Sequence, residues 1–272
     1  MHKLILLISM LTSSALASIP ENELDKADNE TTWYVTEQNF WDIIKTVYDI
    51  YKPVFDGLKT DTGETVSWWF ESDWNSHTVN IYSKKEKVPP YNWNRWTIQV
   101  HGALARRVQM TKEGFALALC HEIGHQIGGY KFMDYLPKSC EGQADYYATH
   151  VCARKVFAKW SNADLKKTPL MIELCDKNFD TKAERDVCLY SIAGSQSLSE
   201  VMYVANQQTR TPEIDSPDNF KAKLTYQLHT PAQCRLDTFI AGILCDKTWD
   251  DKRIPVEKNA VCRNRPSCWY AP

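Results

Sequence analysis

The 272-residue chain carries a formal net charge of −2 at pH 7, and this weak negative charge argues against nucleic acid as a partner. Its length suffices for one large hydrophobic core or two modest lobes. Aromatic residues make up 12 % of the chain and include 10 tryptophans, many of them in the N-terminal third. We interpret these side chains mainly as core and hairpin packing residues, with a sugar- or peptide-binding surface as the alternative.

The first 17 residues have the pattern of a secretory signal peptide. Lys3 precedes an apolar run from Leu4 to Leu11, and Ala15-Leu16-Ala17 is a small-x-small cleavage site before Ser18. The apolar run is too short to span a bilayer, and no later run of roughly 18 apolar residues follows it in the sequence. We therefore expect an exported protein, periplasmic or secreted, without an integral membrane segment once the signal is removed. Residues 18–36 are acidic and polar and are expected to form a loosely held arm.

The next part of the chain is predicted to contain one long helix and a small sheet. Apolar residues at helical spacing predict a helix over 38–58. Runs of aromatic and β-branched residues predict a mostly antiparallel sheet over 65–102, with strands at Thr65–Phe70, His77–Tyr82 and Trp96–Val100 and a loop at Lys84–Pro90. We expect Trp96–Val100 at the edge of this sheet, where an extended peptide could add by backbone pairing.

The remainder is predicted to be mostly helical. Thr111 is a good cap for a helix over 115–127 that stops at Gly128-Gly129. After a loop over 130–138, Ser139 is expected to cap a second helix, and further helices are expected near 165–175, 182–204 and 230–244, with a loop at 205–228. The predicted fold class is α+β: one mostly helical domain over 37–247 with a small antiparallel sheet, followed by a disulfide-braced tail over 248–272.

All nine cysteines lie at or beyond position 120, and in an exported chain such cysteines are expected to form disulfides. Local spacing suggests the pairs Cys175–Cys188, Cys234–Cys245 and Cys262–Cys268. Cys120, Cys140 and Cys152 then remain, so one thiol is unpaired. The sequence alone leaves the connectivity open.

Residues 121–125 have the sequence His-Glu-Ile-Gly-His. Two histidines four residues apart lie one turn above the other on a helix, so both imidazoles can reach one ion. Glu122 then lies beside that ion, where it can take a proton from a water molecule. This is the His-Glu-x-x-His signature of zinc hydrolases.

A catalytic zinc ion needs a third protein ligand and one open position. Glu141 and Asp145 are four residues apart on the second predicted helix and share one face of it. We expect Glu141 to bind the ion and Asp145 to accept a hydrogen bond from a ligand histidine, which fixes the orientation of the ring. The simpler alternative is that both acids are solvated. We interpret His101 and His150 as structural, and Cys120 and Cys140 as disulfide or buried residues, because each is one step round the helix from a predicted ligand.

His-Glu-x-x-His followed by Glu-x-x-Ala-Asp resembles the gluzincin metallopeptidases, and most closely the branch of the HtpX-like and CAAX-prenyl proteases and their periplasmic, chaperone-like relatives. Asn80-Ile81-Tyr82 is similar to that branch's Asn-x-aromatic strand. His229-Thr230-Pro231 with Arg235 is similar to its later His-Pro…Arg element, although Thr230 intervenes here. The resemblance covers mainly residues 78–150 and 229–240.

This resemblance implies that His121, His125 and Glu141 bind zinc, that Glu122 is the general base and that Asp145 supports a ligand. It places the catalytic candidates His229 and Arg235 near the open position, where they polarise a carbonyl or gate access. The expected function is hydrolysis of peptide bonds in a protein or peptide substrate. Two alternatives stay open: a protease-like envelope chaperone or binding protein with latent activity, and a zinc amidase that acts on cell-wall material.

Overall fold

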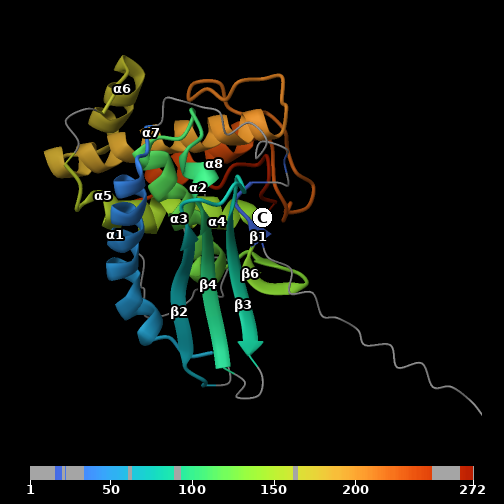
Figure 1. Ribbon diagram of the computed structural model, residues 1–272. Helices are drawn as coiled ribbons and strands as arrows, with labels where there is room; N and C mark the ends of the chain where they lie inside the picture. The colour runs from blue at the N-terminus through green and yellow to red at the C-terminus, as the bar shows by residue number, and fades with distance from the viewer. Residues whose placement is uncertain are drawn as a thin grey trace, which may run out of the picture.

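The computed structural model describes residues 16–19, 22, 34–60, 63–88, 93–161, 165–246 and 264–271. Residues 1–15 of the predicted signal peptide and most of the predicted tail lie outside these ranges. The described chain has an α+β fold in which helices gather at one end of a small sheet (Figure 1). No helix within the described ranges is long and apolar enough to cross a membrane.

The sheet is mixed: two of its three described strand pairings are antiparallel, as predicted, and the third is parallel. Its strand order is β1 (Leu16–Ala17), β3 (Ile81–Val88), β4 (Trp93–His101), β2 (Val66–Asp73). β1 and β4 are antiparallel to β3, whereas β2 is parallel to β4. β4 therefore lies between β3 on one side and β2 on the other.

The predicted edge strand, residues 96–100, instead lies at the centre of the sheet within β4, because it has a neighbour on each side. β1 pairs only with the start of β3, so the rest of β3 forms the outer edge of the sheet. Residues 84–88 of this strand were predicted to be a loop. Its Ser-Lys-Lys-Glu-Lys sequence gives no apolar signal. Charged residues are typical of strands at the edge of a sheet. Lys85 shows how such a charge is used, because its Nζ donates to the backbone oxygens of Gln126 and Pro137.

Helix α1 (Glu37–Asp56) matches the predicted long helix. Thr36 and Asn39 form a capping box at its start, and its apolar face is buried. Figure 1 shows α1 alongside β2. The contact is aromatic, since the ring of Trp68 lies 4.3 Å from that of Phe55 and 5.6 Å from that of Tyr48. Trp68 is thus a core residue, as composition suggested.

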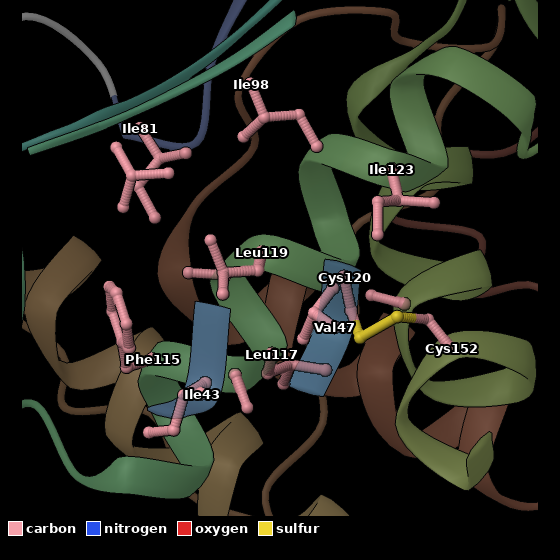
Figure 2. Close-up of a cluster of buried hydrophobic side chains, with 14 of the residues drawn as sticks. Ile43, Val47, Ile81, Ile98, Phe115, Leu117, Leu119, Cys120, Ile123 and Cys152 are labelled. Atoms are coloured by element: carbon pink, nitrogen blue, oxygen red, sulfur yellow. A yellow bond between two sulfur atoms is a disulfide. The ribbon is translucent and has the colours of Figure 1, made fainter. Parts of the chain in front are cut away.

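Helix α3 (Lys112–Ile127) is the central helix of the fold. Thr111 caps it as predicted, by accepting a hydrogen bond from Gly114 N, and every residue from Glu113 to Ile127 is buried. Figure 2 shows its side chains packed with those of α1 and the sheet. The other helical elements are α2 (Gly102–Ala105), α4 (Glu141–Tyr147), the π-helical turn η2 (Ala148–Cys152), α5 (Ala153–Phe157), α6 (Pro169–Asn178), α7 (Lys182–Ala205) and α8 (Ala232–Ile243).

Two predictions around α4 are corrected. The predicted loop 130–138 contains a small hairpin, β5 (Phe132–Met133) with β6 (Leu136–Ser139). Helix α4 then starts at Glu141, two residues after the predicted cap at Ser139, with Cys140 in the N-cap position. Ser139 does not cap α4. Its Oγ instead donates to Gly129 O and holds the hairpin against the end of α3.

The described disulfides are Cys120–Cys152, Cys175–Cys188 and Cys234–Cys268. The prediction of Cys175–Cys188 is confirmed, and the free thiol is the buried Cys140. The predictions of Cys234–Cys245 and Cys262–Cys268 are wrong. Helix α8 is the reason, because it separates Cys234 from Cys245 by about 16 Å along its axis, and a disulfide spans less than about 7 Å between Cα atoms.

Candidate metal centre

Helix α3 places the two motif histidines inside the protein. Their ring centroids lie 4.5 Å apart, with the ring planes at 82°. His121, Glu122 and His125 are completely buried. This burial arises because α1, α4 and α7 all contact α3 and leave none of its faces to solvent.

The Nδ1 atom of each imidazole has an acceptor. His121 Nδ1 lies 2.7 Å from Asp145 Oδ1, and His125 Nδ1 lies 2.8 Å from the carbonyl oxygen of Ser139. Because a carbonyl or carboxylate oxygen can only accept, each ring carries a proton on Nδ1, and Nε2 is the ring atom that faces Glu141. Both histidines are therefore oriented as metal ligands normally are.

Helix α4 brings Glu141 to these two Nε2 atoms. Glu141 Oε2 lies 3.3 Å from Nε2 of His121, and Oε1 lies 3.3 Å from Nε2 of His125. The approach depends on Gly124 in the motif, since a Cβ there would lie 2.7 Å from Ala144 O and 2.9 Å from Ala144 Cα. A glycine at this position lets the two helix backbones meet.

The site has the unsatisfied polar atoms that a cation requires. Among the described residues, no hydrogen-bond partner is found for Glu122 Oε2, His125 Nε2 or either carboxylate oxygen of Glu141, although all are buried. Buried polar atoms are nearly always paired, so this group needs an explanation. A metal ion would satisfy these lone pairs together, and ligand atoms of His121, Glu122 and His125 lie within 4.8 Å of one another.

Asp145 and Arg235 form a charged pair behind His121. Arg235 Nε donates to Asp145 Oδ2 at 2.7 Å and Nη2 donates to Oδ1 at 2.5 Å. Burial alone would lower the pKa of His121, but the adjacent Asp145 carboxylate outweighs it and raises this pKa to about 9. Burial also tends to raise the pKa of Asp145, and Arg235 outweighs that effect, so the pKa of this carboxyl is lowered and it stays ionised.

The pKa values of the other two carboxyl groups of the site, Glu122 and Glu141, are shifted in opposite directions. Burial raises the pKa of Glu122, and the neighbouring histidines offset this only in part. For Glu141, burial is outweighed by His125 and His229, which hold its pKa well below the ordinary value. Glu141 is therefore ionised and suited to a metal ion, whereas Glu122 is the carboxylate that more readily accepts a proton.

His229 and Arg235 both reach the site. His229 Nε2 lies 3.6 Å from Glu141 Oε2, and its side chain is 23 % exposed, which places it on the solvent side. Arg235 lies on the buried side, with Nη2 at 3.6 Å from the same Glu141 oxygen. The residues interpreted as structural have other partners: His101 Nδ1 lies 2.9 Å from Ser76 Oγ, and Cys120 is in a disulfide.

Two further side chains reach the site that the sequence did not indicate. Ser18 Oγ donates to Glu122 Oε1 at 2.6 Å. Lys138, from β6, is buried and donates to Ser83 O at 2.7 Å. Burial lowers its pKa to about 8, against the opposing influence of Glu122 and Glu141. Lys138 has no motif of its own, and its only signal is its position three residues before Glu141.

Comparison of the chain with known protein families, with curated proteins and with solved structures finds no match. The chemistry of the site therefore rests on the geometry described above.

Proposed function

We propose that this chain is an exported zinc metallopeptidase with a zincin-like core of the gluzincin type. The observation that carries the proposal is the approach of two histidine Nε2 atoms and the Glu141 carboxylate to one another, beside the buried carboxylate of Glu122. Two imidazoles and one carboxylate form a ligand set that suits catalytic zinc and leaves one coordination position open.

The residues have separate tasks in this proposal. His121, His125 and Glu141 hold the zinc ion, which when bound lowers the pKa of water and polarises a carbonyl. Glu122 takes a proton from the attacking water and returns it to the leaving amine. Its raised pKa supports this role, because a base that must also act as an acid works best with a pKa near the working pH.

Arg235 orients the carbonyl of the substrate in this proposal. Support comes from its Nη1, which already donates to a peptide carbonyl, that of Ser18, at 2.6 Å. Asp145 holds the guanidinium in place through two hydrogen bonds. His229, on the solvent side of Glu141, is a positioning residue at the entrance.

The proposed compartment is supported by the cysteines and by the predicted signal peptide. Three described disulfides support an oxidising environment, as in a periplasm or outside the cell. The amidase alternative depended on exposed tryptophans in the N-terminal part. Trp68, Trp74 and Trp96 are buried in the core and offer no surface for sugar stacking. Trp41 on α1 is exposed, and one exposed ring on a helix gives this alternative little support.

The second candidate function is a protease-like binding protein with latent activity. One observation favours it: Ser18 of the chain itself lies in the site, where it contacts the proposed general base and Arg235. A site covered in this way does not turn over substrate until the cover moves.

The test measures zinc content and cleavage of casein or a peptide library in parallel for the wild type and Glu122→Gln. We expect one zinc ion in both proteins and cleavage by the wild type alone. Glu141→Gln should lower zinc affinity by at least about 100-fold, because loss of a ligand costs more than loss of its supporting residue. His77→Gln changes an exposed histidine far from the motif and serves as the control.

The outcomes separate the hypotheses. Zinc in both proteins with no cleavage by either would favour the latent binding protein. Absence of bound zinc in the wild type would overturn the assignment of the ligands as well as the proposed reaction.

A further inference from the structure

Residues 16–19, here called the N-terminal segment, form an additional strand next to the site. They run antiparallel to β3, with Leu16 opposite Ser83 and Ala17 opposite Tyr82, and Ser18 N donates to Ile81 O at 3.0 Å. Figure 1 shows β1 at the outer side of β3. Without this segment, the outer edge of β3 would present unpaired backbone groups, to which an extended peptide can add.

Ser18 contacts the proposed general base, Glu122, and the residue proposed to orient the substrate carbonyl, Arg235. Its Oγ donates to Glu122 Oε1 at 2.6 Å, and its carbonyl oxygen accepts from Arg235 Nη1 at 2.6 Å. The carbonyl therefore lies where a substrate carbonyl would be oriented. The hydroxyl occupies one of the two carboxylate oxygens of the proposed base, so the segment competes with water for Glu122 and with a substrate carbonyl for Arg235.

Ile19 anchors the segment through both its backbone and its side chain. Its backbone N donates to Asn80 Oδ1 at 3.2 Å, and its carbonyl oxygen accepts from Asn80 Nδ2 at 2.8 Å. The side chain is completely buried and belongs to the main hydrophobic cluster. Burial of an isoleucine side chain removes apolar surface from water and so stabilises the bound segment. The anchor thus selects an aliphatic residue directly after a small one.

We propose that the N-terminal segment is an intramolecular competitor of the substrate, and that the cleft it fills takes extended peptides with a small residue followed by an aliphatic one. This inference rests on the proposed peptidase function. Covalent attachment gives the segment an effective concentration on the order of mM, against which a free peptide must compete. Removal of the predicted signal before Ser18 takes away Leu16 and Ala17, and with them the pairing of β1. Ser18 and Ile19 remain in the mature chain and keep the groups that contact Glu122, Arg235 and Asn80.

The first experiment compares three zinc-loaded full-length chains: wild type, Ile19→Asp and Ile19→Val. Ile19→Asp places a carboxylate in an apolar pocket and should expel the segment. We expect its kcat/KM on a peptide library to rise at least about fivefold, because a larger fraction of the molecules has an open cleft. Ile19→Val keeps an aliphatic anchor and should behave like the wild type. Zinc content and thermal unfolding show whether Ile19→Asp is folded.

The second experiment does not depend on catalysis. A labelled, acetylated peptide of residues 16–22, Leu-Ala-Ser-Ile-Pro-Glu-Asn, is titrated into the wild type and Ile19→Asp by fluorescence anisotropy. The control peptide exchanges Ser and Ile and keeps the composition. We expect binding to Ile19→Asp at least about tenfold tighter than to the wild type, because its cleft is free, and weaker binding of the control peptide to both.

The results distinguish the two proposals. Selective binding of the peptide without cleavage by any variant supports the competitor and contradicts the peptidase. Cleavage of casein with equal or no binding of the two peptides, and with no gain in rate for Ile19→Asp, overturns the competitor and leaves the peptidase standing.

Discussion

His121 lies between a predicted metal ion on one side and the Asp145–Arg235 pair on the other. Asp145 serves two purposes there. It accepts the Nδ1 proton and so directs Nε2 to the ion, and its charge raises the pKa of His121 to about 9 against the effect of burial. In the metal-free chain, a proton therefore competes with the metal for this imidazole.

This competition predicts a pH dependence of zinc affinity. Below a pKa of about 9, His121 is protonated in the metal-free chain and a proton must leave before zinc binds. The apparent affinity should therefore rise about tenfold per pH unit up to pH 9 and level off above it. Competition with a chelator at several pH values measures this. In Asp145→Asn, the pKa of His121 falls, so the rise should end at a lower pH.

The same variant also tests the orientation of the ring. Loss of a carboxylate behind a ligand histidine costs about 10–100-fold in metal affinity. Asp145→Asn should show this loss even at about pH 10, one unit above the pKa of His121, where most of the competition from the proton has gone. An unchanged affinity with an unchanged pH profile would contradict both roles of Asp145.

At the scale of elements, the helices were predictable because their signals are local. The apolar face of α1, the Thr111 cap of α3 and the spacing of His121 and His125 all follow from residues within a few turns of one another. The extent of β3 was not predictable. Ile81 and Tyr82 belong to the predicted strand 77–82, but residues 84–87 are charged and only their pairing with β4 makes them a strand.

The residues of the candidate site also fall into those that the sequence predicts and those that it does not. Its motif residues could be predicted because the helix repeat fixes how they lie relative to one another. Ser18 and Lys138 were missed because they reach Glu122 and its surroundings from other parts of the chain. Their positions depend on strand pairing across the sheet, for which a single sequence carries no periodic signal.

Helix α3 and helix α4 must meet closely for Glu141 to reach the histidines, and Gly124 is the point of contact. A methyl group at this position would overlap the backbone of Ala144. Gly124→Ala should therefore push α4 away, lower zinc affinity by at least about tenfold, and cost about 1–3 kcal/mol of unfolding free energy from overpacking. Isothermal titration with zinc and chemical denaturation measure the two effects.

Gly57→Ala is the matched control for this prediction. Gly57 ends α1, and a Cβ there would meet its neighbours at 3.6 Å, an ordinary contact. Its zinc affinity should equal that of the wild type. If Gly124→Ala binds zinc as tightly as Gly57→Ala does, the close approach of the two helices is not what places Glu141.

At the scale of the whole molecule, the C-terminal segment 264–271 braces the helix that carries Glu141. The ring of Trp269 covers Gly142, where a Cβ would lie 2.2 Å from Trp269 Cδ2. Trp269 is completely buried. The adjacent Cys268 is bonded to Cys234 of α8, so the disulfide holds this ring against the start of α4. The disulfide thus links α8 to the ligand helix through a segment that lies far away in sequence.

This arrangement predicts that the disulfides differ in their effect on metal binding. Cys234–Cys268 encloses 34 residues and Cys175–Cys188 encloses 13, so each contributes roughly 3–4 kcal/mol by restricting the unfolded chain. Serine substitution of either pair should therefore lower the melting temperature by a similar amount. Only the loss of Cys234–Cys268 should also weaken zinc binding below the melting temperature, because only that bond holds Trp269 on α4. Equal zinc affinity in the two double variants would show that packing alone holds the ligand helix and that the disulfide acts only on the unfolded chain.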